Sequence, residues 1–143
     1  MNMTDLFFQK LKRSLIKHEG YEKFIYTDTK GKLTGGIGYN FTDRGLSDDW
    51  INKQFQEDAD YFYNQLMQYQ WFQRLNSDRK IVLIDMAFMG LKKFLEFKKM
   101  IAALQNDDYA SAAKEMLNSK WASDVGQRAK DLANGMLRGS YNI

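Results

Sequence analysis

The sequence predicts a mainly helical α+β fold, and three observations support this prediction. Apolar side chains recur at helical spacing through most of the 143 residues. Residues 18–40 interrupt this pattern with five glycines and with short aromatic and β-branched runs, which are typical of strands and tight turns. Hydrophobic residues make up 44% of the chain and aromatic residues 15%, which is enough for a packed core. We therefore expect one domain with a small β-lobe near its N-terminus.

The N-terminal part is expected to be a helix followed by a β-hairpin. Residues 4–18 carry apolar side chains at every fourth position, and Gly20 would cap the end of this helix. Residues 24–34 predict two short strands around the turn sequence DTKG. The glycine-rich run at 35–38 is expected to continue as extended backbone that approaches a neighbour or a ligand closely. The expected β-lobe covers residues 20–46.

The remaining sequence predicts a connecting helix and then a helical lobe. Ser47 and the two aspartates after it form a helix start, and the connecting helix is expected over residues 47–69. The helical lobe is expected over residues 77–138, together with the N-terminal helix. Its first helix, capped by Ser77, contains the run IVLIDMAFMG, whose apolar character nearly all round predicts a buried central helix. Further helices are expected over residues 94–104, 107–118 and 124–136.

Composition restricts the chemistry that the chain can perform. It has no cysteine, which excludes disulfides and thiolate metal sites, and its single histidine, His18, excludes a histidine zinc cluster. No segment approaches the roughly 18 apolar residues of a membrane span, and the N-terminus lacks a secretion signal. We therefore expect a protein that stays in the cytoplasm until another agent releases it. The net charge of +3 favours polyanionic partners such as nucleic acid, anionic lipid or bacterial cell wall.

Glu19, Asp28 and Thr34 are the candidate catalytic residues. Hydrolysis of a glycosidic bond needs a carboxylic acid that protonates the leaving oxygen and a polar group on the other face of the sugar that handles water. Glu19 suits the first role, because the partial negative charge of a helix C-terminus disfavours ionisation of a carboxyl group there. Asp28 in its turn and Thr34 on the returning strand suit the second. On spacing alone an ordinary alternative stays open, in which Asp28 only forms the turn and Glu19 is a solvated helix end.

The arrangement of these residues resembles that of the phage-type lysozymes, the endolysins of glycoside hydrolase family 24. The shared features are an EG pair at a helix end, eight residues between Glu19 and Asp28, five between Asp28 and Thr34, and then G-x-G. Two later segments also resemble the family. These are DMAF at 85–88 and the pattern W-x(4)-G-x-R-A at 121–129.

This resemblance implies a two-lobed, lysozyme-like fold over the whole chain, 1–143, as a single domain. The implied activity is endo-acting hydrolysis, with inversion, of the β-1,4 bond between N-acetylmuramic acid and N-acetylglucosamine in peptidoglycan. Such an enzyme lyses bacteria, works as a monomer and needs neither a metal nor an organic cofactor. A phage-encoded enzyme of this kind would wait in the host cytoplasm until a holin permeabilises the membrane.

The resemblance also implies roles for individual residues. Glu19 would be the general acid, and Asp28 and Thr34 would hold the attacking water. Asn40, Phe88 and Arg128 would bind substrate: Phe88 would line the sugar channel at the end of the central helix, and Arg128 would be a charged partner of Glu19.

The chain departs from the family pattern at two places. Tyr39 stands where many relatives have a histidine paired with an aspartate that matches Asp58. Tyr39 cannot form that ion pair, although it can still donate a hydrogen bond to Asp58. The run Phe88-Met89-Gly90 is one residue shorter than the family's M-A-F-N-x-G and lacks its asparagine, which would point polar atoms toward sugar amides.

Two alternatives differ from a hydrolase. A basic helical domain could bind peptidoglycan or nucleic acid without turnover, although no nucleic-acid-binding signature is present and a binder has little need of the three candidate residues together. A lytic transglycosylase uses one acid and lets the muramic 6-hydroxyl attack, so it needs no aspartate that holds water. The Asp28–Thr34 pair therefore favours hydrolysis over transglycosylation.

Overall fold

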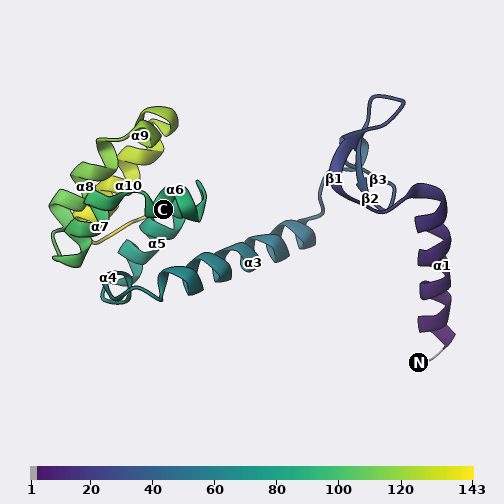
Figure 1. Ribbon diagram of the computed structural model, residues 1–143, viewed down its shortest axis with the longest axis horizontal. Coiled ribbons are helices and arrows are strands. Elements are labelled where there is room, and N and C mark those ends of the chain that lie inside the picture. The colour runs from purple at the N-terminus through teal and green to yellow at the C-terminus, as the bar shows by residue number, and fades with distance from the viewer. Residues whose placement is uncertain (1–2) are drawn as a thin grey trace. The chain divides into compact units, whose positions relative to one another are not determined.

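The computed structural model describes residues 3–143 and is mainly helical, with a three-stranded antiparallel sheet near the N-terminus (Figure 1). This architecture confirms the predicted fold class. In chain order the elements are α1 (Met3–Glu19), β1 (Glu22–Thr27), β2 (Leu33–Gly36), β3 (Tyr39–Asn40), α2 (Phe41–Arg44), α3 (Asp48–Leu66), α4 (Gln70–Gln73), α5 (Ser77–Ala87), α6 (Leu91–Leu95), α7 (Lys98–Gln105), α8 (Tyr109–Leu117), α9 (Lys120–Val125) and α10 (Gln127–Arg138).

The chain divides into two compact units, and the division falls inside α3. The N-terminal unit runs to Lys53 and the helical unit from Gln54 to Ile143. The N-terminal helix belongs to the first of these units, and its expected grouping with the helical lobe stays a prediction. None of the helices within residues 3–143 has the length and apolar character that a membrane span requires.

The N-terminal helix ends as the sequence predicts. Gly20 adopts a φ of +86°, and its N–H donates to the carbonyl of Ile16 at 2.9 Å. This is a glycine cap, in which a left-handed residue satisfies one of the last helical carbonyls. The cap leaves Glu19 as the final residue of α1, and the chain turns directly into β1.

The sheet has the strand order β1-β2-β3 and is antiparallel throughout. Thr27 lies opposite Leu33 in the β1–β2 pair, and Thr34 lies opposite Asn40 in the β2–β3 pair. The expected extended backbone over 35–38 is wrong in its second half. Gly36 and Gly38 have φ values of +58° and +62°, so the chain turns between β2 and β3 instead of extending. Glycine adopts such φ values more readily than any other residue.

The helix starts of the second half are partly as expected. Ser47 caps α3, since its hydroxyl accepts the N–H of Trp50 at 3.1 Å. The expected Ser77 cap is wrong by one residue, because the side chain of Asn76 accepts the N–H of Arg79 and so caps α5. Asparagine and serine serve equally well in this position, which is why the sequence left the choice ambiguous.

Two expected helices are each divided into two. The segment over 94–104 is interrupted where Phe97 takes a non-helical ψ of 64°, between α6 and α7. The segment over 124–136 is interrupted at Gly126, whose φ of +60° ends α9 and precedes α10. The expected break after the connecting helix contains the short helix α4, and the helix expected over 107–118 forms as α8.

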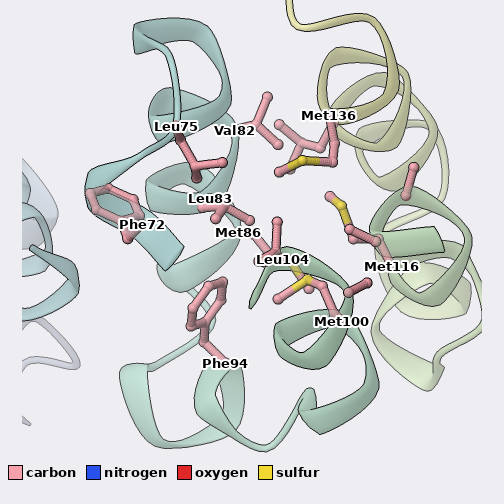
Figure 2. Packing of buried hydrophobic residues seen from close by; sticks show 14 of the residues in the cluster. Phe72, Leu75, Val82, Leu83, Met86, Phe94, Met100, Leu104, Met116 and Met136 are labelled. Carbon is pink, nitrogen blue, oxygen red and sulfur yellow. The ribbon is translucent and has the colours of Figure 1, made fainter. Parts of the chain in front are cut away.

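The hydrophobic core lies in the helical unit (Figure 2). Side chains from the central helix α5 meet others from α7, α8 and α10, and Met86, Met100, Met116 and Met136 are all fully buried there. Methionine is flexible and polarisable, so it fills irregular gaps between helices. The central helix is buried on one side only, since Val82 and Leu83 are fully buried while Ile81 is 49% exposed.

Gly135 marks a close approach of α10 to α5. A Cβ atom placed on Gly135 would lie 2.9 Å from Val82 Cγ2 and 3.1 Å from Tyr141 Cδ1. Replacement of a helical glycine by alanine normally stabilises a helix. Here we expect Gly135→Ala to lower the free energy of unfolding by about 1–3 kcal/mol, because the added methyl overpacks the contact. Urea unfolding followed by circular dichroism measures this change.

The neighbouring substitution Asn134→Ala is the matched control. Asn134 is exposed on the same helix, so alanine there adds helix propensity without a contact. It should leave stability unchanged or raise it slightly. Gly135→Ala as stable as the wild type would contradict the packing described for α5 and α10.

Candidate active site

Asp28 is held in a tight turn by backbone hydrogen bonds. Its Oδ1 accepts the N–H of Lys30 at 2.9 Å and of Lys32 at 2.8 Å. The backbone closes the same turn, since the N–H of Asp28 donates to the carbonyl of Lys32 and that of Gly31 donates to the carbonyl of Asp28. The predicted DTKG turn is thus confirmed. One carboxylate oxygen of Asp28 is occupied by the turn, which leaves Oδ2 for another partner.

Thr34 brings a hydroxyl group to that second oxygen. Its Oγ1 lies 3.4 Å from Asp28 Oδ2 and 3.2 Å from the carbonyl of Lys32. Both distances are longer than the 2.7–2.8 Å typical of hydroxyl hydrogen bonds. One hydroxyl proton serves only one of these acceptors at a time, so the contact with Asp28 is loose. Thr34 is only 7% exposed, so its side chain is packed within the β-lobe.

The turn lowers the pKa of Asp28 below its ordinary value of 3.8, chiefly through the hydrogen bond from the Lys32 N–H. The Lys30 N–H and the Thr34 hydroxyl act in the same direction, whereas partial burial opposes them. Hydrogen bonds to a carboxylate favour its ionised form. Asp28 is therefore an anion under all but strongly acidic conditions.

Glu19 lies against the turn between β2 and β3. A Cβ atom on Gly38 would lie 2.8 Å from both Cβ and Oε2 of Glu19, closer than any real side chain allows. Glycine at this position therefore lets the end of α1 approach the sheet. The prediction that this glycine-rich run permits a close approach is confirmed, and the neighbour is the candidate acid itself.

Asn40 and Tyr39 form local contacts in the same unit. Asn40 caps α2, where its Oδ1 accepts the Asp43 N–H at 3.0 Å and its Nδ2 donates to Asp43 Oδ2 at 2.9 Å. The Tyr39 hydroxyl donates to the carbonyl of Gly45 at 2.6 Å. Its expected hydrogen bond with Asp58, which belongs to the helical unit, stays a prediction. The contact of Asn40 with substrate stays a prediction, since both ends of its side chain are used within the β-lobe.

Arg128 belongs to the helical unit and forms an ion pair with Asp85. Its Nε donates to Asp85 Oδ1 at 2.8 Å, and its terminal nitrogen donates to the Asp85 carbonyl at 2.7 Å. This ion pair was not predicted from the sequence, although a lone acid within the apolar run IVLIDMAFMG indicates a buried or paired carboxylate. The expected pairing of Arg128 with Glu19 stays a prediction.

Phe88 lies at the end of the central helix, as expected. It is the C-terminal cap residue of α5, is 46% exposed and packs on Phe62 with ring centroids 4.9 Å apart. The shortened run after it forms a tight turn, in which the N–H groups of Met89 and Gly90 donate to carbonyls three residues earlier. Its role in lining a sugar channel stays a prediction.

A groove of about 740 Å³ lies on the helical unit. Phe97 and Trp121 form part of its wall, with their rings in edge-to-face contact at 6.3 Å. The charged residues around it carry both signs: Lys93, Lys98, Lys99, Lys120, Glu96, Glu115 and Asp124. The groove therefore has walls of mixed charge.

The pKa of Asp28 is open to direct measurement. We expect NMR titration of its side-chain carboxyl carbon to give a midpoint below 3.8, because the turn stabilises the anion. At a pH above the pKa that Asp28 has in the unfolded chain, its anion contributes fully to stability. This contribution is lost as the pH falls through the lower pKa of Asp28 in the folded protein. The melting temperature should therefore fall progressively between pH 5 and about 2. It should fall less in Asp28→Asn, because that variant lacks the titrating carboxylate.

Asp108 provides the internal reference for this titration. Its carboxylate is held in a similar way by the N–H and hydroxyl of Ser111, which lower its pKa too. Asp108 should titrate at the same low midpoint in wild type and in Asp28→Asn. An Asp28 midpoint at or above 3.8 would mean that the turn does not form as described.

Comparison with known proteins supports the family resemblance predicted from the sequence. No family model matches the chain. "Probable T4-type lysozyme 1" of Dictyostelium discoideum is 32% identical over 72 residues, which are 50% of this chain and 42% of that protein, so the match spans less than half of the relative's length. "Probable T4-type lysozyme 2" of the same organism is 25% identical over 149 aligned positions, covering 82% of this chain and 88% of that protein. The chain is thus similar to the T4-type lysozymes, as its glycine-rich segment predicts.

Proposed function

We propose that this chain is an endo-acting N-acetylmuramidase that hydrolyses the β-1,4 bond between N-acetylmuramic acid and N-acetylglucosamine with inversion. The observation that carries the proposal is the loose contact between Thr34 Oγ1 and Asp28 Oδ2 at 3.4 Å, beside a carboxylate whose other oxygen is fixed. Similarity to proteins named as lysozymes supports the same class of reaction.

Glu19 acts as the general acid in this proposal. Its carboxyl proton passes to the glycosidic oxygen as the bond from that oxygen to the muramic anomeric carbon breaks. The close approach of Glu19 to Gly38 places its side chain beside the turn between β2 and β3. Such positioning is a large part of what an enzyme contributes to a proton transfer.

Asp28 and Thr34 hold the attacking water on the opposite face of the sugar. The water accepts a hydrogen bond from the Thr34 hydroxyl, or donates one to its oxygen, and donates another hydrogen bond to Asp28 Oδ2. As the water oxygen bonds to the anomeric carbon, Asp28 takes up that proton. The low pKa of Asp28 keeps it ionised, and therefore able to bind the water, down to acidic pH. An inverting pair of carboxyl groups is about 6.5–9.5 Å apart, which leaves room for this water.

The substrate-binding roles belong to the same proposal. Arg128 supplies positive charge, Phe88 an aromatic surface for a sugar face, and Asn40 polar atoms near the β2–β3 turn. The net charge of +3 adds a general attraction to the anionic cell wall that salt weakens. Bacterial lysis from the host cytoplasm, with a holin that opens the membrane, completes the proposal. Both relatives come from Dictyostelium discoideum, so a phage origin rests on the sequence resemblance alone.

Mass spectrometry of released fragments tests the reaction. Purified peptidoglycan is digested in heavy-oxygen water by wild type and by Glu19→Gln. We expect reducing muramic acid ends that carry the heavy oxygen from wild type. Glu19→Gln cannot donate a carboxyl proton. It should release fragments at least about 100-fold more slowly than wild type, in line with the typical contribution of a general acid.

Glu22→Gln is the matched control, since it makes the same change three residues later on β1 and should leave the rate unchanged. Anhydromuramic ends from wild type would identify a transglycosylase instead. Binding to the wall without any released fragment would identify a non-catalytic binding module. Either result would contradict the proposed hydrolysis.

A further inference from the structure

The four-residue helix α2 contacts the start of β2 through three successive residues. The Phe41 ring covers Gly35, where an added Cβ would lie 3.2 Å from Phe41 Cε2. The Thr42 hydroxyl accepts the N–H of Leu33 at 2.8 Å. The next residue, Asp43, pairs with the ammonium group of Lys32, also at 2.8 Å. A short helix thus attaches to Lys32, Leu33 and Gly35, on both sides of Thr34 along the chain.

Lys32 connects this attachment to the candidate catalytic pair. Its N–H donates to the Asp28 carboxylate, and its carbonyl accepts from both the Asp28 N–H and the Thr34 hydroxyl. A shift of the Lys32 peptide unit would therefore change the position of Asp28 and of Thr34 together. Its side chain is the part that α2 holds.

Asp43 is also connected to β2 through Asn40, the cap of α2. Its second carboxylate oxygen accepts a hydrogen bond from Asn40 Nδ2, and its N–H donates to Asn40 Oδ1. Asn40 lies opposite Thr34 in the β2–β3 pair. The contacts thus form a closed ring: Thr34 to Asn40, Asn40 to Asp43, Asp43 to Lys32, and Lys32 back to Thr34 and Asp28.

We propose that α2 positions the Asp28–Thr34 pair for the proposed hydrolysis, and that Asp43, Lys32 and Thr42 are the positioning residues through which it acts. This inference rests on the proposed function for its effect on rate, but its effect on geometry does not depend on catalysis. The proposal also gives Asn40 a role inside the β-lobe, as the residue that fixes Asp43. None of these side chains takes part in a chemical step.

An isolated exposed ion pair would be a weak basis for this proposal, because such pairs contribute little stability on average. The pair between Lys32 and Asp43 differs because Asp43 is also held by Asn40. The backbone of Lys32 is fixed by the turn, so the pair joins a restrained acid to the residue whose main chain carries the contacts with Asp28. Thr42 adds an uncharged contact to the next residue of the strand.

The titration of Asp28 in Asp43→Ala separates positioning from simple charge effects. The charged groups that act on Asp28 are Lys30 in the same turn and Lys32 at the start of β2, and Asp43 on α2 faces Lys32. Removal of the negative charge at Asp43 alone would lower the pKa of Asp28 further. Loosening of the Lys32 N–H bond would raise it. The two explanations therefore predict opposite signs.

We expect the Asp28 midpoint to rise in Asp43→Ala, and also in Thr42→Val, which removes no charge. We expect kcat on peptidoglycan to fall roughly tenfold in each variant with KM changed less than twofold, a smaller loss than the hundredfold that a 1 Å misplacement can cause. The acid limb of the pH–rate profile should move to higher pH with the midpoint. Asp49→Ala, which removes an equal charge on α3 in the same unit, is the control and should change neither.

A midpoint that stays constant or falls in both variants, with the NMR spectrum showing a folded protein, would overturn the proposal. If Asp43→Ala does not fold, the Asp28 midpoint in Thr42→Val alone tests the proposal. If wild type releases no fragments, the proposed function fails, and the titration still decides whether α2 positions the pair.

Discussion

The geometry of the candidate site depends on one interaction, the hydrogen bond from the Lys32 N–H to Oδ1 of Asp28. It closes the turn between β1 and β2, fixes the carboxylate and is the main cause of its low pKa. It also decides which oxygen of Asp28 remains for Thr34. A carboxylate held by backbone donors needs no reorganisation when a water arrives, which is the condition for effective electrostatic catalysis.

The two units of the chain obtain their order in different ways. The helical unit has a buried core of methionine, leucine and aromatic side chains. The N-terminal unit has few buried positions among its described residues, and these are Thr34 and Gly35. Its local geometry comes instead from glycine turns, caps and side-chain hydrogen bonds. Such contacts are directional, so they suit a site where atoms must be placed, whereas core packing mainly supplies stability.

Much of the fold and part of the site could be predicted from the sequence. The Gly20 cap, the DTKG turn and the Ser47 cap follow from local rules, because each involves residues close in the chain. The interruptions at Phe97 and Gly126 were missed, since helical periodicity continues across them. The contacts of Arg128 with Asp85 and of Lys32 with Asp43 were also missed. Charge in a sequence identifies candidates for pairing, but only the fold brings a particular pair together.

The stereochemistry of the first product shows whether hydrolysis proceeds with inversion, as proposed. If Asp28 and Thr34 deliver water to the face opposite Glu19, cleavage of the β-linkage gives an α-configured reducing end before mutarotation. Proton NMR of the anomeric region in the first minutes of digestion of a defined glycan distinguishes the two anomers. With inversion, we predict that the α-anomer of N-acetylmuramic acid appears first. Initial formation of the β-anomer would contradict it, because retention requires a different role for Asp28.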